Sequence, residues 1–373
     1  MSRWRALAAF PVLVASAFTA NAVARPTPPV ATADAPAHTP ADVDRPARHH
    51  KAADADAAKP AAGDDAKPAK TADAHKDTAA VDTGKAPAPD ESAPGKPDPF
   101  AVDPALGHAL RIDGDEAEDL VAFTFDDGPN PETTPAVLTA LARYDIPATF
   151  FIVAQRLVGK HGERSRALLA REDREGYLIG SHSFSHLNLK HASKSMADKE
   201  VVQAQKIIAE TLGRPLGLFR PPFGALGGAA ATAVKNSGLT DVLWSVDTLD
   251  WRTPNAAKLR KKVMRMILAQ RGGVVLMHDI KKVTAKVIGD IFDDLEIENC
   301  ARLAKGGTPI IPVSLHYFLR DGVKGKGKPR PIPPEVAART ASYRATLAAR
   351  CAARPAPAPA ATTTPATTAP KSP

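Results

Sequence analysis

Residues 120–129 read LVAFTFDDGP, an apolar run that ends in two adjacent carboxylates, Asp126 and Asp127. A short apolar run rich in valine and phenylalanine, stopped by Gly-Pro, predicts a buried strand that ends in a turn. Further along the chain, residues 182–186 (HSFSH) supply two imidazoles. Two imidazoles and one carboxylate are a common ligand set for catalytic zinc or a similar divalent ion. The second carboxylate is then free for proton transfer.

The first 24 residues predict a secretory signal peptide. Two positive charges in residues 1–5 precede a short apolar run over 6–20, and small-residue cleavage sites follow at 20–24. The run is too short to span a membrane comfortably and contains Pro11. We therefore expect an exported protein, periplasmic or extracellular in the cell envelope, with no transmembrane anchor after signal cleavage.

Residues 25–107 are mostly Ala, Pro, Asp, Lys and Thr, with almost no large apolar side chains. Such a segment buries too little apolar surface to offset the entropy of ordering it, so we expect a disordered linker. The catalytic domain is then expected over 108–322. A basic tail rich in Pro, Ala and Thr follows over 323–373 and is also expected to be disordered, apart from a helix over about 335–353.

Almost all of the net charge of +8 lies in residues 323–373, which hold nine basic residues and one acidic residue. Such a tail suits an anionic envelope polymer, although a merely solvated tail is equally consistent with it. It lacks the interleaved aromatic residues of a nucleic-acid platform, and we expect no nucleic-acid partner. Cys300 and Cys351 are the two cysteines of the chain. In an oxidising compartment they could pair and staple the tail helix to the domain.

Between residues 119 and 319, short apolar runs alternate with longer stretches of helical character, which predicts an α/β fold with a parallel sheet. The seven expected strands cover residues 121–125, 148–153, 177–180, 216–219, 242–246, 273–277 and 309–315. Expected helices include 135–143, 194–212, 225–236 and 256–270.

Side chains that can bind metal or transfer protons follow directly after five of these strands. They are Asp126 and Asp127, then His182, Arg220, Asp247 and Asp250, and finally His278 and Asp279. Strand interiors are apolar here, so core formation does not explain this clustering. An active site at the carboxyl-terminal rim of a barrel requires this placement.

Five motifs in order resemble those of the polysaccharide deacetylases, the NodB homology domain of carbohydrate esterase family four. They are Thr124 to Pro129 (TFDDGP), His182 to His186 (HSFSH), Arg220 to Phe223 (RPPF), Asp250-Trp251 and Leu276 to His278 (LMH). The resemblance covers about residues 118–319. It implies a distorted (β/α)7-type barrel and a metal-dependent hydrolase that removes N-acetyl groups from N-acetylglucosamine residues of a peptidoglycan or chitin-type polysaccharide, releasing acetate.

The resemblance also assigns roles to residues. Asp127, His182 and His186 would hold the divalent metal, zinc first and cobalt or another ion as the alternative. Asp126 would be the base oriented by Arg220, and His278 the acid paired with Asp250. The backbone of Phe223 would face the oxyanion, and Trp251 and Leu276 would line the acetyl methyl group. Asp247, Asp279 and His316 receive no catalytic role, and ion pairing, capping or a structural part is expected for them.

Other functions fit the chain less well. A glycosidase needs two carboxylates on opposite sides of a bond, roughly 5–10 Å apart, which adjacent aspartates do not readily provide. A serine hydrolase would carry Gly-x-Ser-x-Gly, which does not occur. An O-acetyl esterase of the acetylxylan type and a noncatalytic carbohydrate-binding envelope protein remain as alternatives. Residues 155–175 are longer and more charged than is usual in the family, and 176–178 (GYL) replace a common Gly-His-Glu, which leaves the preferred polymer open.

Overall fold

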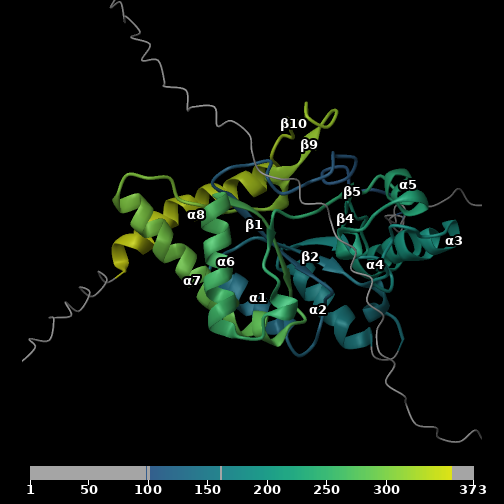
Figure 1. Cartoon of the computed structure of the whole chain (residues 1–373), viewed down its shortest axis with the longest axis horizontal. Helices are drawn as coiled ribbons and strands as arrows, with labels where there is room; N and C mark the ends of the chain where they lie inside the picture. The colour runs from purple at the N-terminus through teal and green to yellow at the C-terminus, as the bar shows by residue number, and fades with distance from the viewer. Residues whose placement is uncertain (1–97, 99–100, 160–161, 355–373) are drawn as a thin grey trace, which may run out of the picture. The chain divides into compact units, whose positions relative to one another are not determined.

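The structure is a computed structural model that describes residues 98, 101–159 and 162–354 of the 373-residue chain (Figure 1). The expected signal peptide (1–24), nearly all of the expected linker and the end of the tail (355–373) lie outside the described residues. Within the described ranges, no helix combines the length and the apolar character needed to cross a membrane.

The described strands are β1 (Leu120–Asp126), β2 (Ala148–Ile152), β3 (Leu178–Ser181), β4 (Leu218–Phe219), β5 (Thr240–Asp241), β6 (Val246–Asp247), β7 (Gly272–His278), β8 (Ile311–Pro312), β9 (Arg320–Asp321) and β10 (Lys328–Pro329). The α-helices are α1 (Thr134–Arg143), α2 (Gly162–Arg174), α3 (Lys194–Ala197), α4 (Ala204–Leu212), α5 (Gly228–Asn236), α6 (Ala256–Gln270), α7 (Lys282–Ala304) and α8 (Pro334–Ala353). Shorter helical turns are η1 (Ala154–Leu157), η2 (Asp198–Gln203), η3 (Pro222–Gly224), η4 (Asp250–Arg252) and η5 (Leu315–Phe318).

The main sheet is parallel and turns back on itself. Its strands lie in the order β5-β4-β3-β2-β1-β7-β6, and β8 pairs with the start of β1. A flat sheet of this order would place its edges about 29 Å apart at ordinary strand spacing. Only residues 242–245 separate the two edge strands, β5 and β6, and they reach roughly 17 Å at most. The sheet must therefore curve into a barrel, which confirms the α/β barrel expected from the sequence.

The segment before β1 fills the seam of this barrel. The N–H of Ile112 donates to the carbonyl of Asp241, and the N–H of Leu243 donates back to the carbonyl of Ile112. On the other side, the N–H of Val274 in β7 donates to the carbonyl of Gly114. Residues 112–114 thus satisfy backbone groups that would otherwise be left unpaired at the seam.

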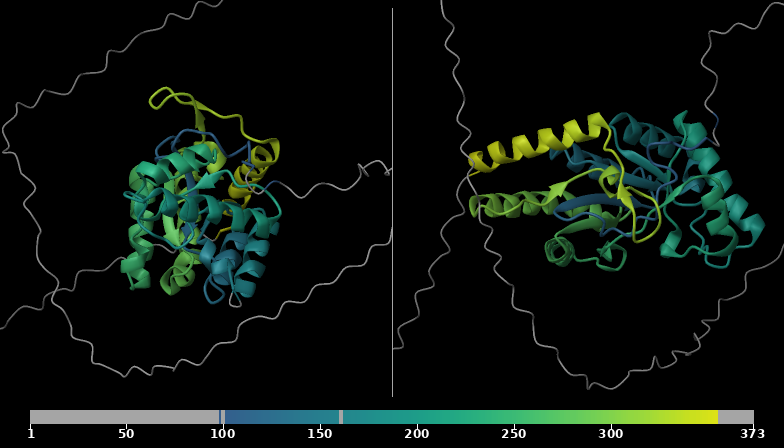
Figure 2. Two further views of the ribbon diagram at one scale, coloured as in Figure 1. Left: turned by 90° about the vertical axis from the view of Figure 1, so that its right-hand side faces the viewer. Right: turned by 90° about the horizontal axis from the view of Figure 1, so that it is seen from above.

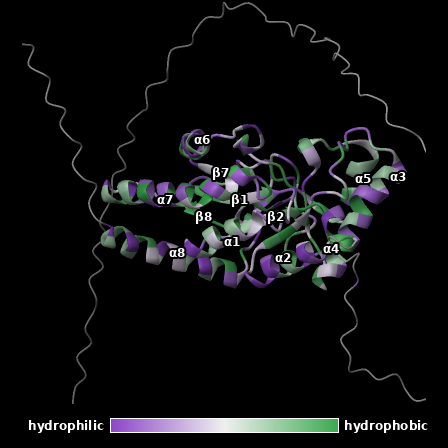
Figure 3. Cartoon of the chain, turned by 90° about the horizontal axis from the view of Figure 1, so that it is seen from below, coloured by the Kyte–Doolittle hydropathy of each residue, from purple (hydrophilic) through white to green (hydrophobic). Residues whose placement is uncertain are grey.

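The core lies between the barrel strands and the surrounding helices. The interior strands are almost entirely buried, including Phe123 and Phe125 of β1 and Phe150 and Phe151 of β2. Helix α7 contacts α1, α6 and α8, and Figure 2 shows α7 and α8 side by side. Hydrophilic and hydrophobic residues intermix along both helices, as expected for helices with one buried face (Figure 3).

Two expected elements differ from those in the structure. Most of the strand expected over 242–246 is instead the connection between β5 and β6, because residues 242–245 cross from one edge of the sheet to the other and only Val246 lies in a strand, β6. The helix expected over 194–212 is interrupted by η2, a π-helical segment over Asp198–Gln203. Helix α2 occupies most of the long charged segment over 155–175.

Helix α8 falls within the segment that the sequence assigned to the basic tail, yet it belongs to the folded unit. Tyr343 and Leu347 on its inner face are buried. Arg350 pairs with Glu296 of α7 at 2.7 Å, and Cys300 of α7 forms a disulfide with Cys351 of α8. The cysteine pairing considered from the sequence is present in the structure.

The disulfide generates a stability prediction. Cys351→Ser should lower the free energy of unfolding by roughly 2–4 kcal/mol, because it frees a loop closed across 51 residues in the unfolded chain. Urea denaturation of the oxidised wild type and the variant measures the difference. Fully reduced wild type is the control and should match the variant. Two free thiols in the unreduced, denatured wild type would contradict the pairing.

Candidate active site

A cleft of about 430 Å³ opens at the carboxyl ends of the barrel strands. It is lined by Asp126, Asp127, His182, His186, Phe223, Trp244, Asp247, Trp251, Leu276, His278 and Lys281. Eight of the ten site residues predicted from the sequence line this cleft. The other two, Arg220 and Asp250, lie behind its wall and bond to residues that line it. The structure therefore brings together every residue that the sequence singled out for the site.

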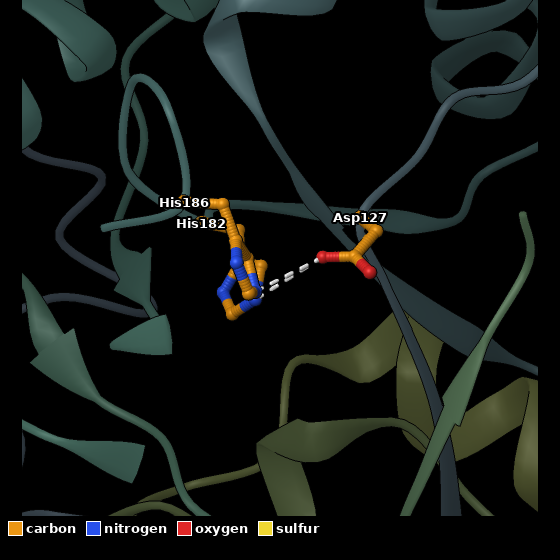
Figure 4. A group of neighbouring side chains, drawn as sticks. All are labelled: Asp127, His182 and His186. Atoms are coloured by element: carbon orange, nitrogen blue, oxygen red, sulfur yellow. Dashed lines mark ion pairs between the residues drawn. The ribbon is translucent and has the colours of Figure 1, made fainter. Parts of the chain in front are cut away.

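Asp127, His182 and His186 form one cluster, with one ligand-type atom from each within 4.8 Å of the others (Figure 4). Oδ1 of Asp127 lies 3.2 Å from Nε2 of His186 and 3.7 Å from Nε2 of His182. Asp127 follows β1 with a left-handed backbone, φ 73°, which turns its carboxylate toward the histidines. Among the described residues, this is the cluster of three or more acidic, histidine or cysteine side chains arranged to hold a metal ion.

The donor atoms of this cluster suit a divalent metal. Burial lowers the pKa of His182 to about 3, so its ring is neutral. Its Nδ1–H donates to the carbonyl of Arg220 at 2.7 Å, which leaves the lone pair of Nε2 facing Asp127. Oδ1 of Asp127 is buried and has no hydrogen-bond donor among the described residues. Two imidazole rings beside an uncommitted carboxylate oxygen form a zinc-type ligand set.

Asp126 occupies a different electrostatic setting from its neighbour. Its Oδ1 accepts a hydrogen bond from Arg220 at 2.8 Å, and both side chains are buried. Burial raises the pKa of Asp126 above its ordinary value, while the charge of Arg220 opposes that rise. The charge and the hydrogen bond of Arg220 favour the ionised form of Asp126, which is the form that accepts a proton.

His278 stands at the end of β7 and is held by Asp250. Its Nδ1–H donates to Oδ1 of Asp250 at 2.7 Å, and its backbone N–H donates to Oδ2 at 2.8 Å. Thr284 of α7 also donates to Oδ2, at 2.6 Å, which fixes the carboxylate. Burial alone would lower the pKa of His278, but the hydrogen bond and charge of Asp250 outweigh it and raise the pKa to about 9. His278 is therefore protonated at neutral pH.

Aromatic and apolar side chains form the remaining cleft wall. Phe223 and Trp251 are both more than half exposed, while Leu276 is buried at the base. The ring of Phe223 meets His186 edge to face at 4.7 Å between centroids. Exposed aromatic faces beside a polar cleft are available for contact with an apolar or sugar face.

The residues without a catalytic assignment have structural partners. Asp279 is fully buried and accepts a hydrogen bond from Thr134 of α1. A Cβ at Gly128 would lie 2.4 Å from its carboxylate, so glycine is required in the turn after Asp127. Oδ1 of Asp247 accepts from the N–H of Leu249 at 3.0 Å, and His316 bonds to Ser314.

Two cleft residues were not singled out from the sequence. Trp244 lies in the connection between β5 and β6, and the guanidinium of Arg220 stands 5.6 Å from its ring. Lys281 precedes α7, just beyond His278 and Asp279. Trp244 falls within the strand expected over 242–246, where an aromatic residue predicts core packing. Lys281 belongs to none of the five motifs, so the sequence did not mark either residue as part of the site.

The fold and the site together define an α/β barrel protein with a candidate metal site, an arginine-paired carboxylate and a protonated imidazole in one cleft. The family model described as "Polysaccharide deacetylase" matches residues 113–242. A peptidoglycan-N-acetylglucosamine deacetylase of Bacillus cereus is 35% identical over 164 residues, which cover 43% of this chain and 73% of that protein. The chain belongs to the polysaccharide deacetylase family.

Further similarities extend over part of the chain. Peptidoglycan-N-acetylglucosamine deacetylase PgdA of Listeria monocytogenes is 39% identical over 165 residues, 44% of this chain and 33% of that protein. The match thus spans about a third of the length of that relative. Among solved structures, peptidoglycan deacetylase PdaC from Bacillus subtilis is 32% identical with a TM-score of 0.42, covering 48% of this chain and 84% of that one.

The geometry of the cluster predicts metal binding. The metal-free full chain should bind one equivalent of Zn²⁺ in isothermal titration calorimetry, and His182→Ala should weaken binding by more than the roughly 10- to 100-fold typical of an outer-shell change. The exposed His191 provides the control, since His191→Ala removes an imidazole outside the cluster. Equal affinities of the two variants would overturn the ligand assignment.

Proposed function

We propose that this protein is a metal-dependent hydrolase that removes N-acetyl groups from N-acetylglucosamine residues of a polysaccharide and releases acetate. The observation that carries the proposal is that the adjacent carboxylates of Asp126 and Asp127, two histidines clustered with Asp127, and the imidazole of His278 all line one cleft. The relatives named as peptidoglycan-N-acetylglucosamine deacetylases support the peptidoglycan or chitin-type polymer. These relatives match less than half of this chain, so the proposed substrate and activity are argued from the residues of the cleft.

Asp127, His182 and His186 would hold the ion, for which zinc is the first choice and cobalt an alternative. A divalent ion bound there supplies Lewis acidity toward a carbonyl oxygen and makes water more acidic. The fixed Nδ1–H bond of His182 to the Arg220 carbonyl keeps Nε2 directed at the cluster.

Amide hydrolysis consumes one water and yields an amine and a carboxylic acid, so protons must leave the water and reach the nitrogen. Oδ2 of Asp126 lies 3.7 Å from Nε2 of His182, on the metal side of the carboxylate, and is placed to take a proton from water. Oδ1 is already bonded to Arg220, which fixes the orientation of the base.

His278 would give a proton to the departing amine nitrogen. Its Nδ1 is committed to Asp250, so Nε2–H is the proton available to the cleft. Leu276 and Trp251 would surround the acetyl methyl group, and Phe223 would bring its backbone to the carbonyl oxygen.

The remaining parts of the proposal concern location. An exported protein, periplasmic or extracellular in the cell envelope, is consistent with the signal-like residues 1–24 and with the disulfide between Cys300 and Cys351. The basic segment over 323–373 would associate with an anionic envelope polymer and not with nucleic acid.

Acetate release by the zinc-loaded full chain tests the function. Chitin oligomers and peptidoglycan should release acetate, and a chelator should abolish the release. Asp126→Asn should lower the rate by roughly 10²- to 10⁴-fold, the usual contribution of a general base, without loss of zinc. Asp173→Asn, at a surface pair with Arg214, is the control. Acetate release from acetylxylan alone would show that the activity is ester hydrolysis and not N-deacetylation. Full activity of Asp126→Asn would overturn the assignment of Asp126 as the base.

The pairing of His278 with Asp250 predicts the alkaline side of the pH–rate profile. A proton donor works only when it is protonated. The protein should therefore be fully active below the pKa of His278, and its hydrolysis rate should fall as pH rises through about 9. Asp250→Asn removes the charge that raises this pKa, so the alkaline limb should move to lower pH. Asp290→Asn, at an exposed pair with Arg260, should leave the limb unchanged. An unshifted limb in Asp250→Asn would show that another group titrates there.

A further inference from the structure

The two histidines of the candidate metal site are held in different ways. His182 is buried, and its ring is fixed by the carbonyl of Arg220. The side chain of His186 is 30% exposed, and its ring makes edge contacts with His182 and Phe223. The placement of His186 therefore depends more on the backbone that carries it than the placement of His182 does.

That backbone is a tight loop with two left-handed residues. Ser183 has φ 67° and His186 has φ 61°, and left-handed non-glycine residues of this kind cost of order 1–3 kcal/mol each. One side of the loop is held by η1, because Ala154 and Gln155 donate their N–H groups to the carbonyls of Ser183 and Phe184. The other side requires an acceptor for the N–H groups of Phe184 and Ser185.

Glu200 is that acceptor. Its Oε2 accepts from the N–H of Phe184 at 3.1 Å and from the N–H of Ser185 at 2.8 Å. Its Oε1 accepts from the hydroxyl of Ser185 at 2.7 Å. The side chain is 1% exposed, so three charge-assisted bonds converge on one buried carboxylate. The residues that donate these three bonds, Phe184 and Ser185, lie between the two histidines in the sequence, and Ser185 directly precedes His186.

The element that carries Glu200 supports a dedicated role. Glu200 belongs to η2, the π-helical segment that interrupts the helix expected over 194–212. Such π segments occur frequently at functional sites. The neighbouring Lys199 places its ammonium 4.9 Å from the ring centroid of Phe184, so two successive residues of η2 hold the same loop.

We propose that Glu200 is a positioning residue that sets the affinity of the metal site by holding the Phe184–Ser185 backbone and thereby orienting His186. The proposal rests on the proposed metal site and deepens it. A buried carboxylate that served stability alone would affect the folded state but not the geometry of one ligand. A measurement of metal affinity in folded protein therefore distinguishes a positioning role of Glu200 from a purely stabilising one.

The experiment titrates Zn²⁺ into the metal-free full chain and into its variants, and records Co²⁺ absorption spectra for each. Glu200→Ala should weaken Zn²⁺ binding by roughly 10- to 100-fold and alter the Co²⁺ spectrum, as outer-shell changes do. Glu200→Gln keeps an oxygen for both N–H groups and should restore most of the affinity. Glu210→Ala, an exposed glutamate of the adjoining α4, is the matched control and should bind like the wild type.

A double-mutant cycle identifies the route of the effect. If Glu200 acts through His186, Glu200→Ala should weaken binding little further once His186→Ala is present, and additive losses would overturn the proposal. Wild-type affinity in folded Glu200→Ala would also overturn it and leave the metal site intact. No Zn²⁺ binding by the wild type would overturn the metal site itself.

A milder variant covers the case in which Glu200→Ala does not fold. Ser185→Ala removes one of the three bonds and should weaken Zn²⁺ binding by roughly 2- to 10-fold, equivalent to about 0.5–1.5 kcal/mol, in protein that remains folded at the assay temperature. A Ser185→Ala affinity equal to that of the wild type would count against the positioning role.

Discussion

The buried guanidinium of Arg220 is the interaction on which the rest of the site depends. It donates to Oδ1 of Asp126 and to the hydroxyl of Thr124 in β1, and to the carbonyls of Val242 and Leu243 at the barrel seam. Its planar face lies 4.1 Å from the ring centroid of Phe151 in β2. Its own carbonyl fixes the ring of His182. One residue thus joins barrel closure to the orientation of a candidate base and a candidate ligand.

A buried charge of this kind is tolerated only with partners. Leaving one member of a buried pair without the other typically costs 3–5 kcal/mol, because the remaining charge stays desolvated. Arg220 and Asp126 therefore constrain each other, and the carbonyls at residues 242–243 complete the solvation of the guanidinium. The sharp crossing between β5 and β6 is useful for this reason, since it frees two carbonyls from sheet pairing and points them at the cation.

Backbone strain gathers at the same end of the barrel. In the described part of the chain, nine non-glycine residues have positive φ, and five of them belong to the site or its loops: Asp127, Ser183, His186, Phe223 and Leu249. Neighbouring residues of a strand point to opposite faces, so Asp126 and Asp127 would normally diverge. The left-handed turn at Asp127 brings both carboxylates to one cleft, where they meet different partners and acquire different chemistry.

The sequence by itself determined the fold class, most strand positions and which residues gather in the candidate site, because apolar runs mark buried strands and parallel strands end at a common rim. It did not determine that residues 242–245 cross between sheet edges, that Arg220 spans the barrel, or that Glu200 holds the loop between His182 and His186. Nor did it show α8 docked on α7. Local patterns of polarity report which residues are buried, whereas the partner of a buried charge depends on strand curvature and closure. Those are set only when the whole barrel forms.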